Sequence, residues 1–142
     1  MTRIMRATAG LAAASIVILG LAGCGGSSSP TTQASAILAK TGATGDGPAY
    51  KVTNNNESSS ACNPGDAEAD GHLSDNSQVN VCVATSNAER ANGLADAIAA
   101  KSDVPIQVGK TTLVYVTSNG VDSLPKARME AIAAKIGGTY WG

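Results

Sequence analysis

The chain has 142 residues, of which 43% are hydrophobic and 15% charged, and its formal net charge at pH 7 is −1. This length and composition suit one small domain. Neither half of the chain forms a basic patch, so the composition argues against a nucleic-acid partner.

The first 23 residues have the features of a signal peptide. Arg3 and Arg6 precede an uncharged run over residues 7–22, which is too short for a comfortable transmembrane span of about 20 residues. The run ends in LAGC (21–24), which resembles the lipobox of bacterial lipoproteins. This resemblance implies cleavage before Cys24, a diacylglyceryl thioether on its sulfur and an acyl group on its new amine. The implied partner is a lipid bilayer, and the implied location is the extracytoplasmic face of the cell membrane. An ordinary cleaved signal peptide is the alternative.

Removal of this peptide leaves eight basic residues against 11 acidic ones. Residues 25–33 are rich in Gly, Ser and Thr, which predicts a flexible tether. We assign residues 24–48 to a lipid-anchored tether that contains a short helix. The folded domain is predicted at 49–142, with its core mainly at 79–142, because most large apolar side chains lie there.

The first part of the mature chain is poor in large apolar side chains. A short helix is predicted at 34–40, ending near Gly42, and a short strand at 49–53. The polar sequences NNNESSS (54–60) and GDAEADG (65–71) predict loops.

The pattern sharpens from residue 78 onward. Val79, Val81 and Val83 alternate with smaller or polar residues, which is the period of a half-buried strand. Ser86 and Glu89 have the spacing of a capping box, which predicts that a helix starts there. The face of this helix that we expect to be buried comprises Ala91, Leu94, Ala95 and Ile98.

Two strands and a second helix follow. The strands are predicted at 104–108 and 111–117, and glycine first in the two-residue loop Gly109-Lys110 suits a type II′ turn. Ser123 can cap the second helix. Its predicted buried stripe comprises Met129, Ile132, Ala133 and Ile136.

The last residues complete the predicted fold. Gly137 can end the second helix in left-handed geometry, and residues 139–141 form a short strand. The order strand, helix, strand, strand, helix, short strand resembles the split βαβ unit of ferredoxin-like folds. We therefore predict an α+β fold, a small two-layer sandwich with both helices on one sheet face. The sequences ERANGLADAIAAK and ARMEAIAAKIGGTYW also resemble small secreted lipoproteins of high-GC bacteria, a likeness that brings no catalytic residues.

Two cysteines remain inside the domain after export. Cys62 and Cys82 are predicted to form a disulfide, because the exported compartment favours oxidation. The bridge would close a loop of about 20 residues and contribute roughly 3 kcal/mol to stability. Redox catalysis and metal binding are the alternatives, but the spacing differs from C-x-x-C and only His72 is available as a further ligand.

Alternating acidic residues followed by glycine imitate the opening of a calcium loop: Asp66, Glu68, Asp70 and Gly71. The twelfth position is Ser77 instead of glutamate, and Asp75 could substitute only in an irregular site. We predict a solvated acidic loop, with weak calcium binding as the alternative. His72 is expected to be a surface histidine.

No enzyme motif is complete. A Ser-His-acid triad would have to use His72, and Glu89 and Glu130 lie on separate predicted helices. The glycines of GATGDG lack the Lys-Ser/Thr of a phosphate-binding loop. The aromatic residues could instead line a ligand groove on an open sheet face, although core or edge packing is the simpler expectation: Tyr50, Tyr115, Tyr140 and Trp141.

These observations predict a membrane-anchored extracytoplasmic lipoprotein that presents a small binding domain. We expect a protein partner at the cell surface, no cofactor and no enzymatic activity. The alternatives are a small-ligand or weak calcium sensor and a hydrolytic enzyme.

Overall fold

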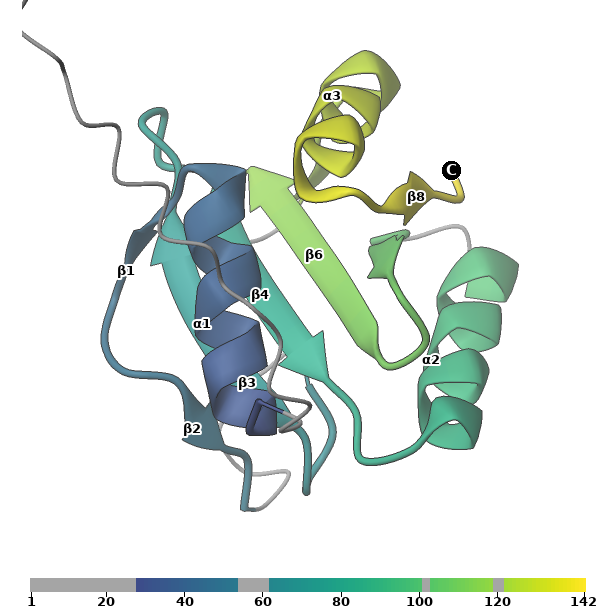
Figure 1. Cartoon of the computed structure of the whole chain (residues 1–142). Coiled ribbons are helices and arrows are strands. Elements are labelled where there is room, and N and C mark those ends of the chain that lie inside the picture. The colour runs from purple at the N-terminus through teal and green to yellow at the C-terminus, as the bar shows by residue number, and fades with distance from the viewer. Residues whose placement is uncertain (1–27, 54–61, 101–102, 119–121) are drawn as a thin grey trace, which may run out of the picture.

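The structure is a computed structural model, which describes residues 28–53, 62–100, 103–118 and 122–142. The described residues form an α+β fold, as predicted, with all strands in a single antiparallel sheet (Figure 1). In chain order, the elements are α1 (Pro30–Thr41), β1 (Thr44–Gly45), β2 (Tyr50–Lys51), β3 (Ala67–His72), β4 (Gln78–Val83), α2 (Asn87–Ala100), β5 (Ile106–Val108), β6 (Thr112–Ser118), β7 (Asp122–Ser123), α3 (Lys126–Ile136) and β8 (Thr139–Tyr140).

Three predicted features lie outside the described residues: the signal peptide at 1–23, the lipidation site Cys24 and the loop at 54–60. Within the described ranges, no helix has both the length and the apolar character needed to cross a bilayer. The lipid anchor therefore stays a prediction from the sequence.

The sheet has the strand order β1-β3-β4-β6-β5-β8, with β2 also paired to β3 and β7 to β6. The unit β4–α2–β5, with β6 between its two strands, matches the split βαβ unit predicted from the sequence. A ferredoxin-like sheet would place the last strand beside β4, but β8 pairs with β5. The free edge of β4 is occupied by β3 through six residue pairs, whereas β8 forms two. The longer ladder satisfies more backbone donors and acceptors, which favours β3 at this position.

β3 corrects the prediction of a loop at residues 65–71. Successive side chains of a strand point to opposite faces, so Ala67 and Ala69 face the core while Glu68 and Asp70 face the other side. The alternation has the period of a strand, but its apolar members are small. Burial of this strand therefore depends on the helix and strands that pack around it.

α1 extends the folded domain toward the N-terminus. Its start is capped by the Ser29 hydroxyl, which accepts a hydrogen bond from the amide of Thr32, and its end at Gly42 has left-handed geometry. The predicted end near Gly42 is confirmed, but the helix begins at Pro30 instead of residue 34. Ile37 and Leu38 are buried against the sheet, so residues 30–41 belong to the core and not to a tether.

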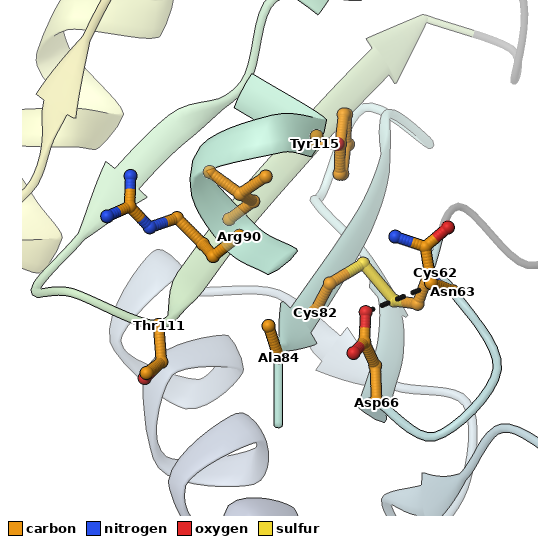
Figure 2. Close-up of a pocket in the computed structure, with 10 residues that line it drawn as sticks. Cys62, Asn63, Asp66, Cys82, Ala84, Arg90, Thr111 and Tyr115 are labelled. Atoms are coloured by element: carbon orange, nitrogen blue, oxygen red, sulfur yellow. Dashed lines mark hydrogen bonds between the residues drawn. A yellow bond between two sulfur atoms is a disulfide. The ribbon is translucent and has the colours of Figure 1, made fainter. Parts of the chain in front are cut away.

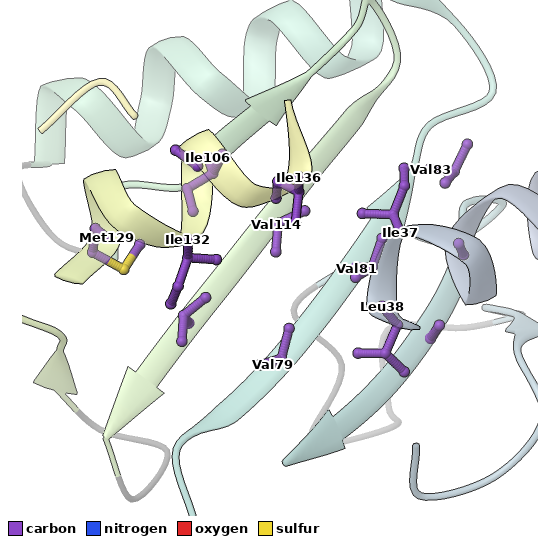
Figure 3. Packing of buried hydrophobic residues seen from close by; sticks show 14 of the residues in the cluster. Ile37, Leu38, Val79, Val81, Val83, Ile106, Val114, Met129, Ile132 and Ile136 are labelled. Carbon is purple, nitrogen blue, oxygen red and sulfur yellow. The ribbon is translucent and has the colours of Figure 1, made fainter. Parts of the chain in front are cut away.

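The main core lies between the valine face of the sheet and the pair α1 and α3 (Figure 3). Val79, Val81 and Val83 all point into it, as their alternation predicts. α3 contributes the stripe predicted from the sequence: Met129, Ile132, Ala133 and Ile136. The N-terminal helix contributes Ala34, Ile37 and Leu38.

α2 and α3 lie on opposite faces of the sheet, which corrects the prediction that both lie on one face. α3 packs on the valine face, whereas Gly93 of α2 lies over Leu113, whose side chain points to the other face. The reason is α1, which fills the valine face together with α3. Of the predicted apolar stripe of α2, only Leu94 is buried, and Ile98 is 40% exposed.

Local signals at the element ends are partly confirmed. α2 begins directly after Ser86, as predicted, while the side chain of Glu89 lies outside the described part. α3 begins at Lys126 with Pro125 at its N-cap position and no side-chain cap. The backbone of Ser123 pairs with Thr117 in the β6–β7 hairpin, so this residue lies two positions before the N-cap and not at it.

Gly109 and Gly137 have the positive φ angles that the sequence predicts, at 60° and 72°. The β5–β6 connection is nevertheless one residue longer than the predicted two-residue turn. Val108 pairs with Thr112, which leaves three residues in the loop.

Candidate functional site

The acidic residues predicted in a calcium-type loop are carried by β3 and its flanks. Glu68 and Asp70 lie two residues apart on the face opposite the valine core, and Glu68 is fully buried. Burial of a carboxyl group requires hydrogen-bonding partners. These partners come from β2 and β4, two of the three strands that pair with β3.

Tyr50 and Asn80 each contact both carboxyl groups. The Tyr50 hydroxyl lies 2.9 Å from Glu68 Oε2 and 3.2 Å from Asp70 Oδ2. The Asn80 side-chain amide donates to Asp70 Oδ1 at 2.7 Å and to Glu68 Oε1 at 3.4 Å. The four side chains therefore form one network, which we call the carboxyl network.

Burial changes the acid–base properties of this network. Desolvation and the charge of Glu68 raise the pKa of Asp70 to about 6, although the hydrogen bond from Asn80 opposes this shift. Desolvation and the hydrogen bond to Glu68 raise the pKa of Tyr50. A carboxyl group that titrates near pH 6 can take up or release a proton under mild conditions. Glu68 itself has no exposed surface, so a substrate cannot reach it directly.

The other predicted ligands are not part of the carboxyl network. Asp75 forms an ion pair with Arg128 of α3 and accepts a hydrogen bond from the amide of Ser77. The Nδ1 atom of His72 lies 2.9 Å from Asp46 Oδ1 at the exposed β1 edge. In the part of the chain that the structure describes, no group of three or more His, Cys, Asp or Glu side chains is arranged to hold a metal ion.

The predicted disulfide joins Cys62 to Cys82 of β4, with 5.3 Å between the Cα atoms. It lines a small cavity on the same face as the carboxyl network, beneath α2 (Figure 2). Asp66 lies beside it, and its Oδ2 atom accepts a hydrogen bond from the amide of Asn63 at 3.1 Å. The cavity has a volume of about 20 Å³, which is room for roughly one water molecule. It does not suit a larger ligand.

Tyr115 closes one side of this cavity, and burial raises the pKa of its hydroxyl. Trp141 lies elsewhere, so the structure does not bring the predicted aromatic residues together in one groove. Tyr140, the last residue of β8, packs at the edge of the core.

Trp141 instead forms one wall of an open apolar groove, and residues of α2 form the rest. The indole is 51% exposed, and its Nε1 donates to Gln107 Oε1 at 3.2 Å. The groove has a volume of about 220 Å³ and is lined by Arg90, Ala91, Leu94, Ala95, Ile98 and Trp141. We call this surface the α2 groove.

Sequence reasoning did not find the roles of Tyr50 and Asn80 or the α2 groove. Tyr50 lies 18 residues before Glu68, and Asn80 lies 12 after it, so neither contact has a local sequence signature. The alternation of alanine with acidic residues in AEADGH is the one signal that could have indicated a strand.

Comparison with known proteins finds no matching family model, no matching curated protein and no matching solved structure.

Proposed function

We propose that the protein is an exported lipoprotein, anchored through acylated Cys24 to the extracytoplasmic face of the cell membrane. The lipobox at residues 21–24 is the sequence feature behind this proposal. The Cys62–Cys82 disulfide supports it, because such bonds persist in oxidising compartments. Pro30, where α1 begins, follows Cys24 by six residues, which span at most about 20 Å. The domain would therefore be held close to the bilayer surface.

The role of the anchored domain is the binding of a protein partner at the cell surface. The α2 groove is the observation that carries this role, because it leaves Ile98 and Trp141 exposed side by side. Adjacent exposed apolar side chains commonly mark interaction sites, and tryptophan is enriched among the residues that dominate binding energy. Small Ala91 and Ala95 leave room between these larger side chains for an apolar side chain of a partner.

Metabolic labelling with a lipid precursor tests the anchor. The full chain is expected to incorporate label, and Cys24→Ala is expected to lose it, while the control Ser28→Ala keeps it. Equal labelling of the wild-type and Cys24→Ala chains would refute lipidation at this residue.

Site-specific photo-crosslinking in cells tests the binding surface. A crosslinker at Ile98 is expected to give one discrete adduct, and Trp141→Ser is expected to abolish it. The same crosslinker at exposed Lys40 on α1 serves as the control. The assignment of this surface fails if position 98 gives no adduct, or the same adducts as position 40.

A further inference from the structure

The contacts of the carboxyl network require more hydrogens than its two donor side chains supply. A phenol carries one hydrogen and a side-chain amide carries two, so Tyr50 and Asn80 together offer three. They lie within hydrogen-bonding distance of all four oxygens of Glu68 and Asp70. The Tyr50 hydrogen can serve only one of its two carboxyl neighbours. All four contacts are favourable together when one carboxyl group carries a proton.

Asp70 is the site at which this proton fits best. Protonated Asp70 can donate from Oδ2 to the Tyr50 oxygen at 3.2 Å, while Tyr50 donates to Glu68 Oε2 at 2.9 Å. Burial and the charge of Glu68 raise the pKa of Asp70 to about 6, in agreement with this arrangement. When both carboxyl groups are ionised, the Tyr50 oxygen faces an Asp70 oxygen with no hydrogen between them.

The neighbouring strands and helix place further polar groups around Asp70. The facing side chain of β4 is neutral Asn80. Among the described residues, the titratable or charged groups on this side of the sheet include Tyr50 on β2, Asp46 after β1, Asp66 before β3, Glu68 and His72 on β3, Tyr115 on β6 with Asp103 near it, and Arg90 on α2. His72 contacts Asp46 and lies on the same face of the sheet, so a variant of His72 is the control for Asp70.

β2 is the element that this proton can control. It pairs with β3 through only two residues, both exposed. Tyr50 is the residue of β2 that belongs to the carboxyl network. The following residue, Val52, is buried, and its amide donates to the Asp66 carbonyl at 2.9 Å. The chain is therefore held at Val52 on one side of β2. On the other side it is held by the Asp46 amide, which donates to the Asp70 carbonyl at 2.9 Å, so the segment that the latch can release is residues 47–51.

We propose that the single proton shared by Glu68 and Asp70 is a pH-sensitive latch, which fastens β2 to β3 through Tyr50 and releases it when both carboxyl groups are ionised. The conformation of this sheet edge therefore depends on the pH of the medium around the exported domain.

Amide hydrogen exchange of the full chain at pH 5 and pH 7.5, corrected for intrinsic rates, tests the latch. The Tyr50 amide, which faces Glu68 of β3 in the ladder, is expected to be protected at least about threefold more at pH 5, relative to Val81 of β4. Asp70→Asn supplies a hydrogen in place of the proton, so it is expected to keep the Tyr50 amide protected at both pH values. His72→Gln is the matched control and is expected to retain the wild-type pH response.

The latch is refuted if protection of the Tyr50 amide is the same at both pH values, if Asp70→Asn keeps the wild-type response, or if His72→Gln abolishes it. Tyr50→Phe provides a second measurement that does not depend on the Asp70 variant. It is expected to lower Tm more at pH 5 than at pH 7.5, because the hydroxyl is fully used only when the proton is present. An equal loss at both pH values would also refute the latch.

Discussion

Glu68 on β3 and Cys82 on β4 are paired in register and lie on the same face of the sheet. The disulfide from Cys82 to Cys62 therefore lies next to the fully buried carboxyl group of Glu68. This relationship places the carboxyl network and the covalent link side by side on that face of the sheet.

Removal of the disulfide is expected to lower stability and to loosen the carboxyl network. The double variant Cys62→Ala/Cys82→Ala should lose about 3 kcal/mol, the chain-entropy value for a loop of roughly 20 residues. Urea unfolding of both proteins, with and without reductant, measures this difference. Reductant should destabilise the wild-type protein and leave the double variant unchanged. Equal stability of the wild-type protein and the double variant in the absence of reductant would contradict a structural role for the bond.

Truncation of Ile37 tests whether α1 belongs to the folded domain. This side chain is 6% exposed and packs in the core. Ile37→Ala should therefore cost about 2–5 kcal/mol, as is typical for a buried isoleucine. Lys40→Ala, on the exposed side of the same helix, is the control and should change stability by less than about 0.5 kcal/mol. If both variants unfold like the wild type, residues 30–41 behave as a tether after all.

The ion pair between Asp75 and Arg128 should stabilise the protein at neutral pH and lose this effect in acid. Arg128 and the amide of Ser77 hold the pKa of Asp75 below its usual value. A carboxyl group with a lowered pKa contributes stability above its unfolded pKa of about 3.9, and this contribution is lost as the pH falls through the folded value. Arg128→Gln should therefore lower Tm at pH 7 and have less effect at pH 2.

Lys126→Gln is the control for this ion pair, because its Nζ lies 3.9 Å from Glu130 in an exposed pair on the same helix. Such pairs contribute little, so its Tm should stay close to that of the wild type. Thermal unfolding followed by circular dichroism is the measurement. An Arg128→Gln effect that is as large at pH 2 as at pH 7 would argue against the ion pair.

Calcium at millimolar concentration is expected to leave Tm unchanged. The oxygens of Glu68 and Asp70 contact Tyr50 and Asn80, while Asp75 contacts Arg128. These carboxyl groups do not converge on one point, as calcium ligands must. Thermal unfolding with calcium and with magnesium as the control tests this expectation. A calcium-specific rise in Tm that Asp70→Asn removes would favour the alternative of a weak calcium sensor.

The sequence predicts best those elements whose signal is local. The alternation at Val79, Val81 and Val83 and the stripe around Ile132 each identify their buried faces, because a periodic apolar pattern specifies a face without reference to the rest of the chain. The cysteine pair was predictable for a similar reason, since export leaves only Cys62 and Cys82 inside the domain.

The remaining features depend on contacts between distant segments. β3 has alanines where a strand usually has larger apolar residues, and its acidic face is buried by Tyr50 and Asn80 from other strands. The stripe of α2 is periodic, but α1 and α3 already fill the valine face, so Ile98 stays exposed. Periodicity identifies an apolar face, but it does not identify what covers that face.

The mass of the intact protein purified from the cell membrane is the most direct test of an exported, lipid-anchored protein. We expect a chain that begins at Cys24, carries a diacylglyceryl group and has no thiols that alkylate before reduction. A chain that retains residues 1–23, an unmodified Cys24, or free thiols at Cys62 and Cys82 would contradict the account.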